Sequence, residues 1–218
     1  MQDVGTGYGT RADARAVSTT TLLGQVMFLV AVALGFTVAG TYIGRDLTDG
    51  TAFILFLAGF GMLLVQGFVE RLRVGPFAIA WLYAIGLLIG LGLGPAISYL
   101  VANDPSTVTQ AAGATALITL GMGAGGFALS KDLAGWMRPL SFVILGCVVV
   151  SFVMLLFSSG GNPILSAIIA IVSALLIAVD FNYLRKHGTG DDAVWLATGI
   201  FVSIINIFLS LLNIFSSD

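Results

Sequence analysis

The stretch PILSAIIAIVSALLIAVDFNYL, residues Pro163–Leu184, decides the class of fold to which this chain belongs. A transmembrane helix needs about 20 consecutive, mostly apolar residues, and this stretch supplies them. Within it, Ile164–Ala178 is apolar at both odd and even positions, whereas a strand of a membrane barrel alternates apolar with polar residues. The stretch therefore predicts a membrane-spanning helix and not a strand.

Further stretches of the same length and character fill most of the chain, and the breaks between them are short and polar. The sequence predicts an all-α membrane protein with seven transmembrane helices, at Thr19–Tyr42, Thr51–Glu70, Phe77–Val101, Thr107–Ser130, Leu140–Ser158, Pro163–Leu184 and Ala193–Phe215. We expect one transmembrane domain, residues 19–216. A polar tail, residues 1–18, precedes it and is expected to be disordered in the cytoplasm.

The overall composition excludes several classes of protein. Of the 218 residues, 58% are apolar and only 9% are charged, whereas a soluble domain has about 25% charged residues. The mean hydropathy is +1.04, so the lipid bilayer is the expected surrounding. A net charge of −2 leaves no basic surface for nucleic acid. Cys147 and His187 are the only residues of their types, which excludes an internal disulfide and a Cys/His metal cluster.

No pattern of an enzyme is found in the sequence. The only lysines, Lys131 and Lys186, lie in predicted loops, which disfavours a retinal protein with an intramembrane Schiff base. His187 also lies in a loop, and the chain contains neither an HExxH nor a GxSxG motif. We therefore expect a protein that is not an enzyme and that uses no cofactor.

The basic residues of the loops predict the orientation. Every lysine and arginine except Arg45 falls in the N-terminal tail or in the second, fourth and sixth connections between helices. Such residues gather on the cytoplasmic side, which places the N-terminus in the cytoplasm and the C-terminus outside. Two lysines against seven arginines indicate a GC-rich prokaryote. The expected location is therefore the plasma membrane, which the chain crosses several times.

Glycines predict where helices approach one another closely. Gly86, Gly90 and Gly94 lie four residues apart on one face of the third helix, and Gly121 and Gly125 do so on the fourth. Helices in lipid associate through such small residues, so we expect both faces to be close contacts. The pair Gly94–Pro95 predicts a kink in the third helix.

One acidic residue, Asp180, lies within a predicted span. It follows the apolar run Ala167–Val179 and precedes Arg185 by five residues, about 8 Å from the helix end. An intramembrane carboxyl group is by default a functional candidate, and burial disfavours its charged form. Asp180 is therefore a candidate pH sensor and a candidate calcium ligand. The alternative is a residue at the wet edge of the membrane, or one that pairs with Arg185 as an anchor.

Polar residues form a stripe on the last helix, which the short loop before it makes a neighbour of the sixth. Ser203, Asn206, Ser210 and Asn213 follow one another at spacings of 3, 4 and 3 residues, within about 80° of arc. Two interpretations stay open: the stripe lines a polar ion pathway beside Asp180, or it holds helices together by hydrogen bonds.

Glu70 and Arg71, at the end of the second helix, lie on the same predicted side of the membrane. They are candidates for an ionic latch with Asp180. The favoured interpretation is simpler, because charged residues commonly fix a helix end at the membrane interface.

Several segments together resemble the Bax inhibitor-1 family of membrane proteins, and in particular its prokaryotic YccA-like branch. The resemblance extends over roughly Leu22 to Phe215, and its order and spacing make it specific. The segments are ALGFTVAGTYIG (Ala33–Gly44), GLGLGPAIS (Gly90–Ser98), the region from Ala116 through SKDL (Ser130–Leu133), and DFN (Asp180–Asn182) followed by a basic loop and SIINIFLSLLNIF (Ser203–Phe215).

This resemblance implies a seven-helix fold in which the last helix is central and enclosed by the others. It also implies a pH-sensitive calcium leak, governed by two aspartates near the cytoplasmic ends of the sixth and seventh helices. Asp180 matches the first aspartate, but Ser203 stands at the second position. One carboxyl group cannot titrate as a coupled pair, so pH gating depends on Asp180 alone. A single acid also weakens selectivity for calcium, which prefers several charged oxygen ligands.

The YccA-like branch implies a different role as well. Its members resemble modulators of a membrane-bound ATP-dependent (AAA) protease, and act through a flexible cytoplasmic tail, here Met1–Ser18. The leading hypothesis is the cation leak, with the protease modulator as its alternative. A third and weaker hypothesis, a small-solute transporter, lacks a helix break in the second half to match Gly94–Pro95.

Overall fold

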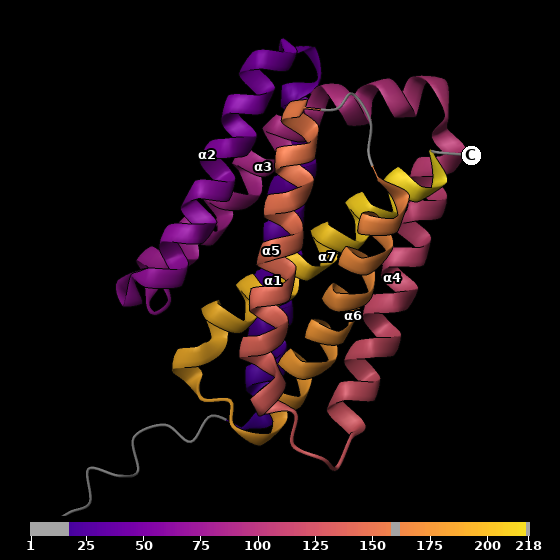
Figure 1. Ribbon diagram of the computed structural model, residues 1–218. Coiled ribbons are helices and arrows are strands. Elements are labelled where there is room, and N and C mark those ends of the chain that lie inside the picture. The colour runs from indigo at the N-terminus through magenta and orange to yellow at the C-terminus, as the bar shows by residue number, and fades with distance from the viewer. Residues whose placement is uncertain (1–17, 158–161, 217–218) are drawn as a thin grey trace, which may run out of the picture.

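A computed structural model describes residues 18–157 and 162–216 of the chain (Figure 1). The described residues are helical and contain no strand, as predicted. Seven helices are long and apolar enough to cross a membrane. They are α1 (Thr19–Ile43), α2 (Asp49–Phe68), α3 (Pro76–Asn103), α4 (Pro105–Ala128), α5 (Ala134–Phe157), α6 (Pro163–Lys186) and α7 (Ala193–Phe215). Short 3-10 turns η1 (Gly44–Asp46), η2 (Glu70–Leu72) and η3 (Gly190–Asp192) accompany them.

The observed boundaries agree with the predicted spans within a few residues, except at the start of α5. This helix begins at Ala134, six residues before the predicted Leu140, and includes Pro139. A proline inside a helix removes one backbone hydrogen bond but does not end the helix when the following turns continue it. Of the predicted tail Met1–Ser18, only Ser18 lies among the described residues, where its side chain accepts a hydrogen bond from the Thr21 amide and caps α1.

The glycine face predicted on α3 is confirmed, and its partner is α1. A Cβ atom on Gly86 would lie 2.7 Å from the carbonyl oxygen of Ala33. A Cβ atom on Gly90 would overlap the backbone of Thr37, and one on Gly94 would overlap the backbone at Gly44. The missing side chains therefore let two backbones touch over more than two helical turns.

The prediction for α4 is wrong in its choice of glycines. Gly121 and Gly125 have open space where a Cβ would stand, and both are exposed. Gly123 and Gly126 instead face α6, where a Cβ atom on Gly123 would lie 3.2 Å from the ring of Phe181. A spacing of three residues keeps two positions on one helix face as well as a spacing of four does, so the sequence offered both pairs.

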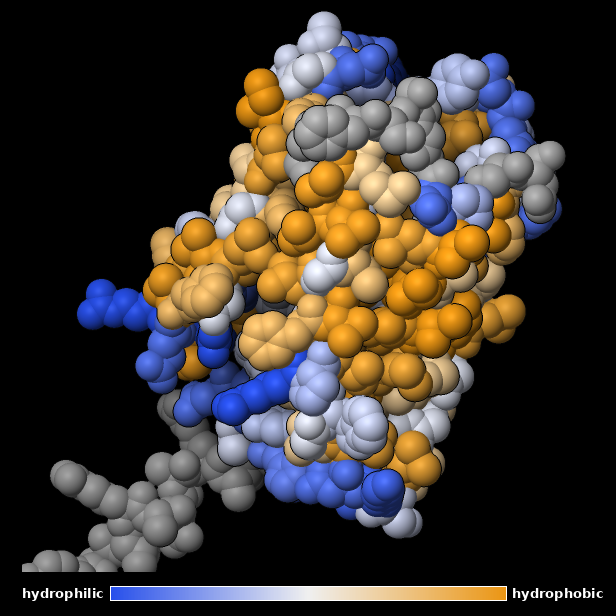
Figure 2. All heavy atoms as spheres, viewed as in Figure 1, coloured by the Kyte–Doolittle hydropathy of each residue, from blue (hydrophilic) through white to orange (hydrophobic). Residues whose placement is uncertain are grey.

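The last helix is the most buried one. No residue of α7 is exposed, and it packs against α1, α4 and α6. In contrast, α5 packs mainly against α6, and none of its described side chains is buried. In Figure 2 a wide apolar band crosses the molecule between hydrophilic ends, as expected of a surface that faces lipid.

The connections α4–α5 and α6–α7 lie at one end of the molecule, and the α1–α2 connection and the C-terminal end of α7 lie toward the other (Figure 1). The α2–α3 connection lies at one side, between these two ends in this view. The predicted kink is present, because α3 turns near Pro95 and its last part runs across that second end toward α4.

Candidate functional site

Asp180 lies in the C-terminal part of α6 and is buried, with 6% of its surface exposed. It is the only buried residue with a charged side chain in the described ranges. No hydrogen bond or ion pair to its carboxylate is found among residues 18–157 and 162–216. Its helix is held on the far side by tight packing against α4, so the carboxylate faces the remaining space beside α7.

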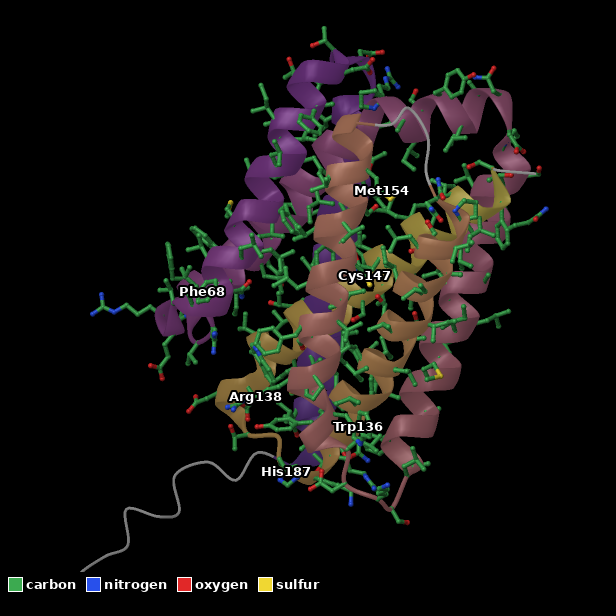
Figure 3. All side chains as sticks on the ribbon, in the orientation of Figure 1. Phe68, Trp136, Arg138, Cys147, Met154 and His187 are labelled. Carbon is green, nitrogen blue, oxygen red and sulfur yellow. The ribbon has the colours of Figure 1, made fainter. Side chains whose placement is uncertain are left out.

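That space is a cavity of about 350 Å³, bounded by α2, α5, α6 and α7, with Ile89 from α3 at its back. Its lining is mainly apolar. Figure 3 shows α5, with Cys147 labelled, in front of α7, and α2, which ends at Phe68, to one side. The polar members of the lining are Gln66, Ser141, Asp180, Thr198, Ser203 and Asn206.

The structure brings three of the four predicted site residues to this cavity. Asp180, Ser203 and Asn206 line it, whereas Ser210 is buried but lies outside the lining. The last member of the stripe, Asn213, accepts a hydrogen bond of 3.0 Å from the hydroxyl group of Ser166 on α6. The early part of the stripe therefore lines a cavity and its end joins two helices, while the ion pathway itself stays a prediction.

Two residues that the sequence analysis did not select complete the surroundings of Asp180. Gly199 lies four residues before Ser203, and a Cβ atom there would be 3.0 Å from Oδ2 of Asp180. The absence of a side chain thus lets the carboxylate rest against α7. Extending the polar stripe by one step toward the start of the helix would have found this position.

Gln66, on α2, is the second of these residues. Its Nε2 donates to the carbonyl oxygen of Leu72 at 2.9 Å and to the hydroxyl oxygen of Thr198 at 3.1 Å. The amide thus joins the end of α2 to α7 beside the cavity. Its Oε1 is buried without a hydrogen-bond partner in the described structure. A polar side chain in an apolar span, Phe53–Phe68, is the signal that could have identified it.

Glu70 and Arg71 are not brought to Asp180. Both are exposed on η2, and neither forms an ion pair with the buried carboxylate in the described residues. The turn buries Leu72 and directs its two charged neighbours outward. The helix end is held instead by Arg73, whose guanidinium donates to the carbonyl oxygens of Gln66, at 3.0 Å, and Gly67.

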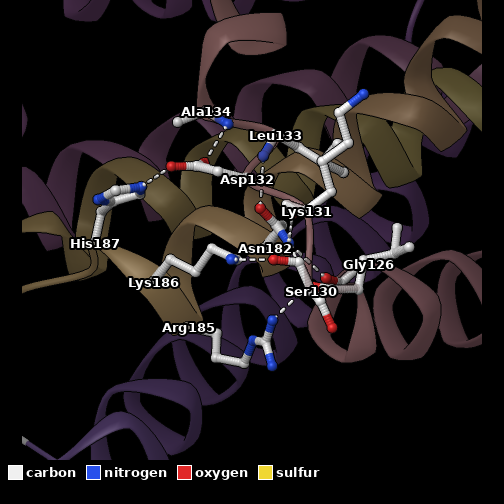
Figure 4. Close-up of polar contacts among 11 residues, drawn as sticks. Gly126, Ser130, Lys131, Asp132, Leu133, Ala134, Asn182, Arg185, Lys186 and His187 are labelled. Atoms are coloured by element: carbon white, nitrogen blue, oxygen red, sulfur yellow. Dashed lines mark hydrogen bonds and ion pairs between the residues drawn. The ribbon is translucent and has the colours of Figure 1, made fainter.

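A separate polar cluster fastens the α4–α5 connection to α6 (Figure 4). The amide of Asn182, fully buried, donates to the carbonyl oxygens of Gly126 at 3.1 Å, Leu129 at 3.2 Å and Lys131 at 3.1 Å. Its Oδ1 accepts a hydrogen bond of 2.8 Å from the amide of Leu133. One side chain thus contacts four backbone groups at the end of α4 and in the loop after it, with the two hydrogens of its amide shared among three carbonyl oxygens.

The basic end of α6 contacts the same connection. Arg185 donates to the carbonyl oxygen of Leu129, and Lys186 donates to that of Ser130. Arg185 forms no ion pair with Asp180 in the described structure, so the anchor considered from sequence is directed to the loop instead. Cations at a helix C-terminus also complement the helix dipole.

His187 and Asp132 close the cluster, with 2.7 Å between Nε2 and Oδ2. The Ala134 amide donates to the other carboxylate oxygen at 2.9 Å. The hydrogen bond from the Ala134 amide, followed by that to His187, lowers the pKa of Asp132 below its ordinary value. The carboxylate of Asp132 is exposed, lies in a loop and has hydrogen-bond partners, whereas that of Asp180 is buried in a helix and has none in the described structure.

The described residues contain no group of three or more His, Cys, Asp or Glu side chains that could hold a metal ion. Asp180 is therefore a lone carboxylate in the described residues, with the neutral polar side chains of Ser203 and Asn206 on the same cavity. This set has fewer oxygen ligands than the roughly six to eight that calcium takes in proteins.

Comparison with known proteins places the chain among relatives. Residues 19–218 match the model of the family described as inhibitor of apoptosis-promoting Bax1. A protein of Vibrio cholerae serotype O1, itself named only as an uncharacterized membrane protein, is 26% identical over 201 residues, which cover 88% of this chain and 87% of that protein. The placement within the YccA-like branch stays a prediction. The family match spans all seven described helices, and the chain therefore belongs to the Bax inhibitor-1 family.

Proposed function

We propose that this protein is a pH-sensitive cation leak in the plasma membrane, with calcium as the permeant ion and protonation of Asp180 as the gate. The observation that carries the proposal is the place of Asp180: a buried carboxylate on a membrane helix, unpaired in the described residues, that lines a cavity shared with Ser203 and Asn206. An ionisable group within a membrane costs free energy to bury, and it is therefore by default a candidate for a role in the passage of ions or protons.

A polar seam along α6 and α7 supports a route beyond the cavity. Ser166, Ser173 and Asp180 lie seven residues apart, and such positions drift by only about 20° per step around a helix. The hydroxyl group of Ser173 is buried without a hydrogen-bond partner in the described structure. The bond between Ser166 and Asn213 closes the far end of this seam. We infer that the structure represents a closed state, in which this bond joins α6 and α7 across the proposed route.

Protonation of Asp180 changes the charge that a cation meets in the cavity. With one carboxyl group and no second acid beside it, the charge at the site is either −1 or 0. The charged form attracts a cation, and the neutral form removes that attraction. We therefore expect flux to rise with pH through a single titration, in contrast to the two linked steps of a carboxyl pair.

The orientation follows from the same proposal and from the loop charges. The end at which α4–α5 and α6–α7 connect carries the basic residues Lys131, Arg138, Arg185 and Lys186, so we place it in the cytoplasm. The Asp180 side of the cavity is then near the cytoplasmic face, where cell pH reaches it.

The test is calcium flux into liposomes that contain the purified protein. Asp180→Asn removes the ionisable group at nearly constant volume. Because the amide stays neutral, we expect flux at high pH to fall at least tenfold and to lose its pH dependence. Asp191→Asn is the matched control, because Asp191 is exposed on η3 and should leave flux unchanged. Identical flux in the wild type and Asp180→Asn at every pH would overturn the assignment of the gate. Flux no greater than in empty liposomes would overturn the channel itself and favour the protease modulator, whose tail, residues 1–17, lies outside the described residues.

A further inference from the structure

The lining of the cavity contains hydrogen-bond acceptors that have no donor in contact with them. It offers the carboxylate of Asp180 and the Oε1 atom of Gln66, neither of which receives a hydrogen bond in the described structure. The hydroxyl group of Thr198 already donates to the carbonyl oxygen of Val194 at 2.8 Å. Within the part of the chain that the structure describes, no lysine, arginine or histidine lines the cavity. Asp180 and Gln66 thus present two hydrogen-bond acceptors, and the described lining supplies no positively charged side chain to donate to them.

Aromatic rings add to the preference for positive charge. Phe56 and Phe60 of α2 and Trp195 of α7 contribute to the lining. The face of an aromatic ring attracts an ammonium group, and the attraction grows where water is excluded. The remainder of the lining is aliphatic, supplied chiefly by α5 and α7.

The cavity also has the size and access that a ligand needs. Its volume of about 350 Å³ lies within the range of small-molecule sites, about 300–1,000 Å³. On α7 its lining extends from Trp195 to Leu209, a rise of about 21 Å. Leu64 of α2 and Leu145 of α5 line it and are also exposed on the lipid-facing surface. An apolar molecule can thus enter sideways from the bilayer between α2 and α5.

We propose that this cavity binds an amphipathic organic cation, with its protonated amine between Asp180 and Gln66 and its apolar body between α2 and α5. The ligand reaches the cavity from the bilayer, where such molecules concentrate. The inference shares Asp180 with the proposed channel, but it requires only binding and not conduction.

The experiment measures binding directly, by equilibrium dialysis against full-length protein in lipid nanodiscs and against empty nanodiscs. The probe is 4-phenylbutylamine at about pH 8, where an alkylamine stays protonated. Pentylbenzene is its neutral isostere, with a methyl group in place of the ammonium group. We expect saturable binding of one amine per chain, above the partition into empty nanodiscs. Asp180→Asn should weaken amine binding at least about tenfold, as for loss of a charge-assisted hydrogen bond, and should leave pentylbenzene binding unchanged.

A second pair of variants tests the entrance without touching the carboxylate. Leu145→Trp narrows the opening and should abolish binding of both probes. Val143→Trp, on an exposed part of α5 outside the lining, should have no effect. Equal weakening of both probes by Asp180→Asn, or amine binding that survives Leu145→Trp, would overturn the proposal. So would amine uptake that never exceeds empty nanodiscs. Binding without calcium flux would leave this inference standing and remove only the channel, whereas flux without binding would do the reverse.

Discussion

The two sides of the molecule are packed in opposite ways. On one side α1 and α3 touch backbone to backbone through Gly86, Gly90 and Gly94. On the other side α5 packs mainly against α6 and buries none of its described side chains. Helices in lipid gain their stability from close packing, so the first pair is a rigid frame and α5 is a loosely held cover. Asp180 lies in a cavity that the cover lines on one side, through Met137, Ser141, Ile144, Leu145 and Val148 of α5.

The largest effect is expected where the frame is tightest. Gly90→Ala places a methyl group on the backbone of Thr37 and should destabilise the protein by about 3 kcal/mol. The measurement is thermal unfolding in detergent. Gly35→Ala is the control, because this glycine of α1 has open space around the added atom. Its effect should be neutral or slightly stabilising, by up to about 1 kcal/mol. Equal loss of stability in both variants would show that the two helices are not in close contact.

A slightly smaller effect is expected at the connection that carries the cover. Asn182→Ala removes the hydrogen bonds to four backbone groups, of which only the Leu129 carbonyl keeps a second donor in the described structure, Arg185, and should cost about 2 kcal/mol. It should also speed proteolysis between α4 and α5. Asn103→Ala, which loses one exposed hydrogen bond to Tyr99, serves as the comparison. If the two variants melt alike and the connection stays protected, Asn182 is not what fastens it.

The contrast between frame and cover also separates what the sequence predicts from what it does not. Hydropathy and helix length located all seven described spans, because a bilayer demands both. The glycine spacing of α3 identified the frame, but the same rule chose Gly121 and Gly125 on α4, which are exposed. A repeat of small residues identifies the contact face of a helix only when no other pair of small residues competes with it. The helix α4 has four glycines within six residues, Gly121–Gly126, so more than one face was possible.

The candidate site was predictable in its core and not in its surroundings. Asp180, Ser203 and Asn206 follow from burying polar residues in apolar helices, and the structure places them on one cavity. Gln66 was missed because its contacts, with Leu72 and Thr198, depend on how α2 ends and where α7 passes. For the same reason Glu70 and Arg71 seemed able to reach Asp180, although η2 turns both outward. Sequence periodicity describes one helix at a time and carries no distance between helices.

A modest effect is expected where the cavity meets α7. Gly199→Ala brings a Cβ atom to 3.0 Å from Oδ2 of Asp180, so the carboxylate must shift by a few tenths of an ångström. We expect a loss of stability of about 1 kcal/mol or less, with a calcium flux that differs from the wild type in its pH midpoint. Gly146→Ala on α5, which has open space, is the matched control. An unchanged midpoint would mean that the position of the carboxylate against α7 does not matter to its titration.

The smallest effect is expected at the exposed pair of Asp132 and His187, and its sign follows from the pKa of Asp132. Hydrogen bonds from Ala134 and His187 lower that pKa in the folded protein. The carboxylate therefore contributes stability above its unfolded pKa, about 3.9, and this contribution disappears as pH falls through the lower folded value. Asp132→Asn should melt slightly below the wild type at neutral pH, and the difference should vanish once the pH falls below the lowered folded pKa. In acid the carboxyl group of Asp132 is neutral, as the amide of Asn is, so no effect of charge remains there. A difference that persists in acid would therefore assign the effect to packing of the loop, and the cover would be held by shape and not by charge.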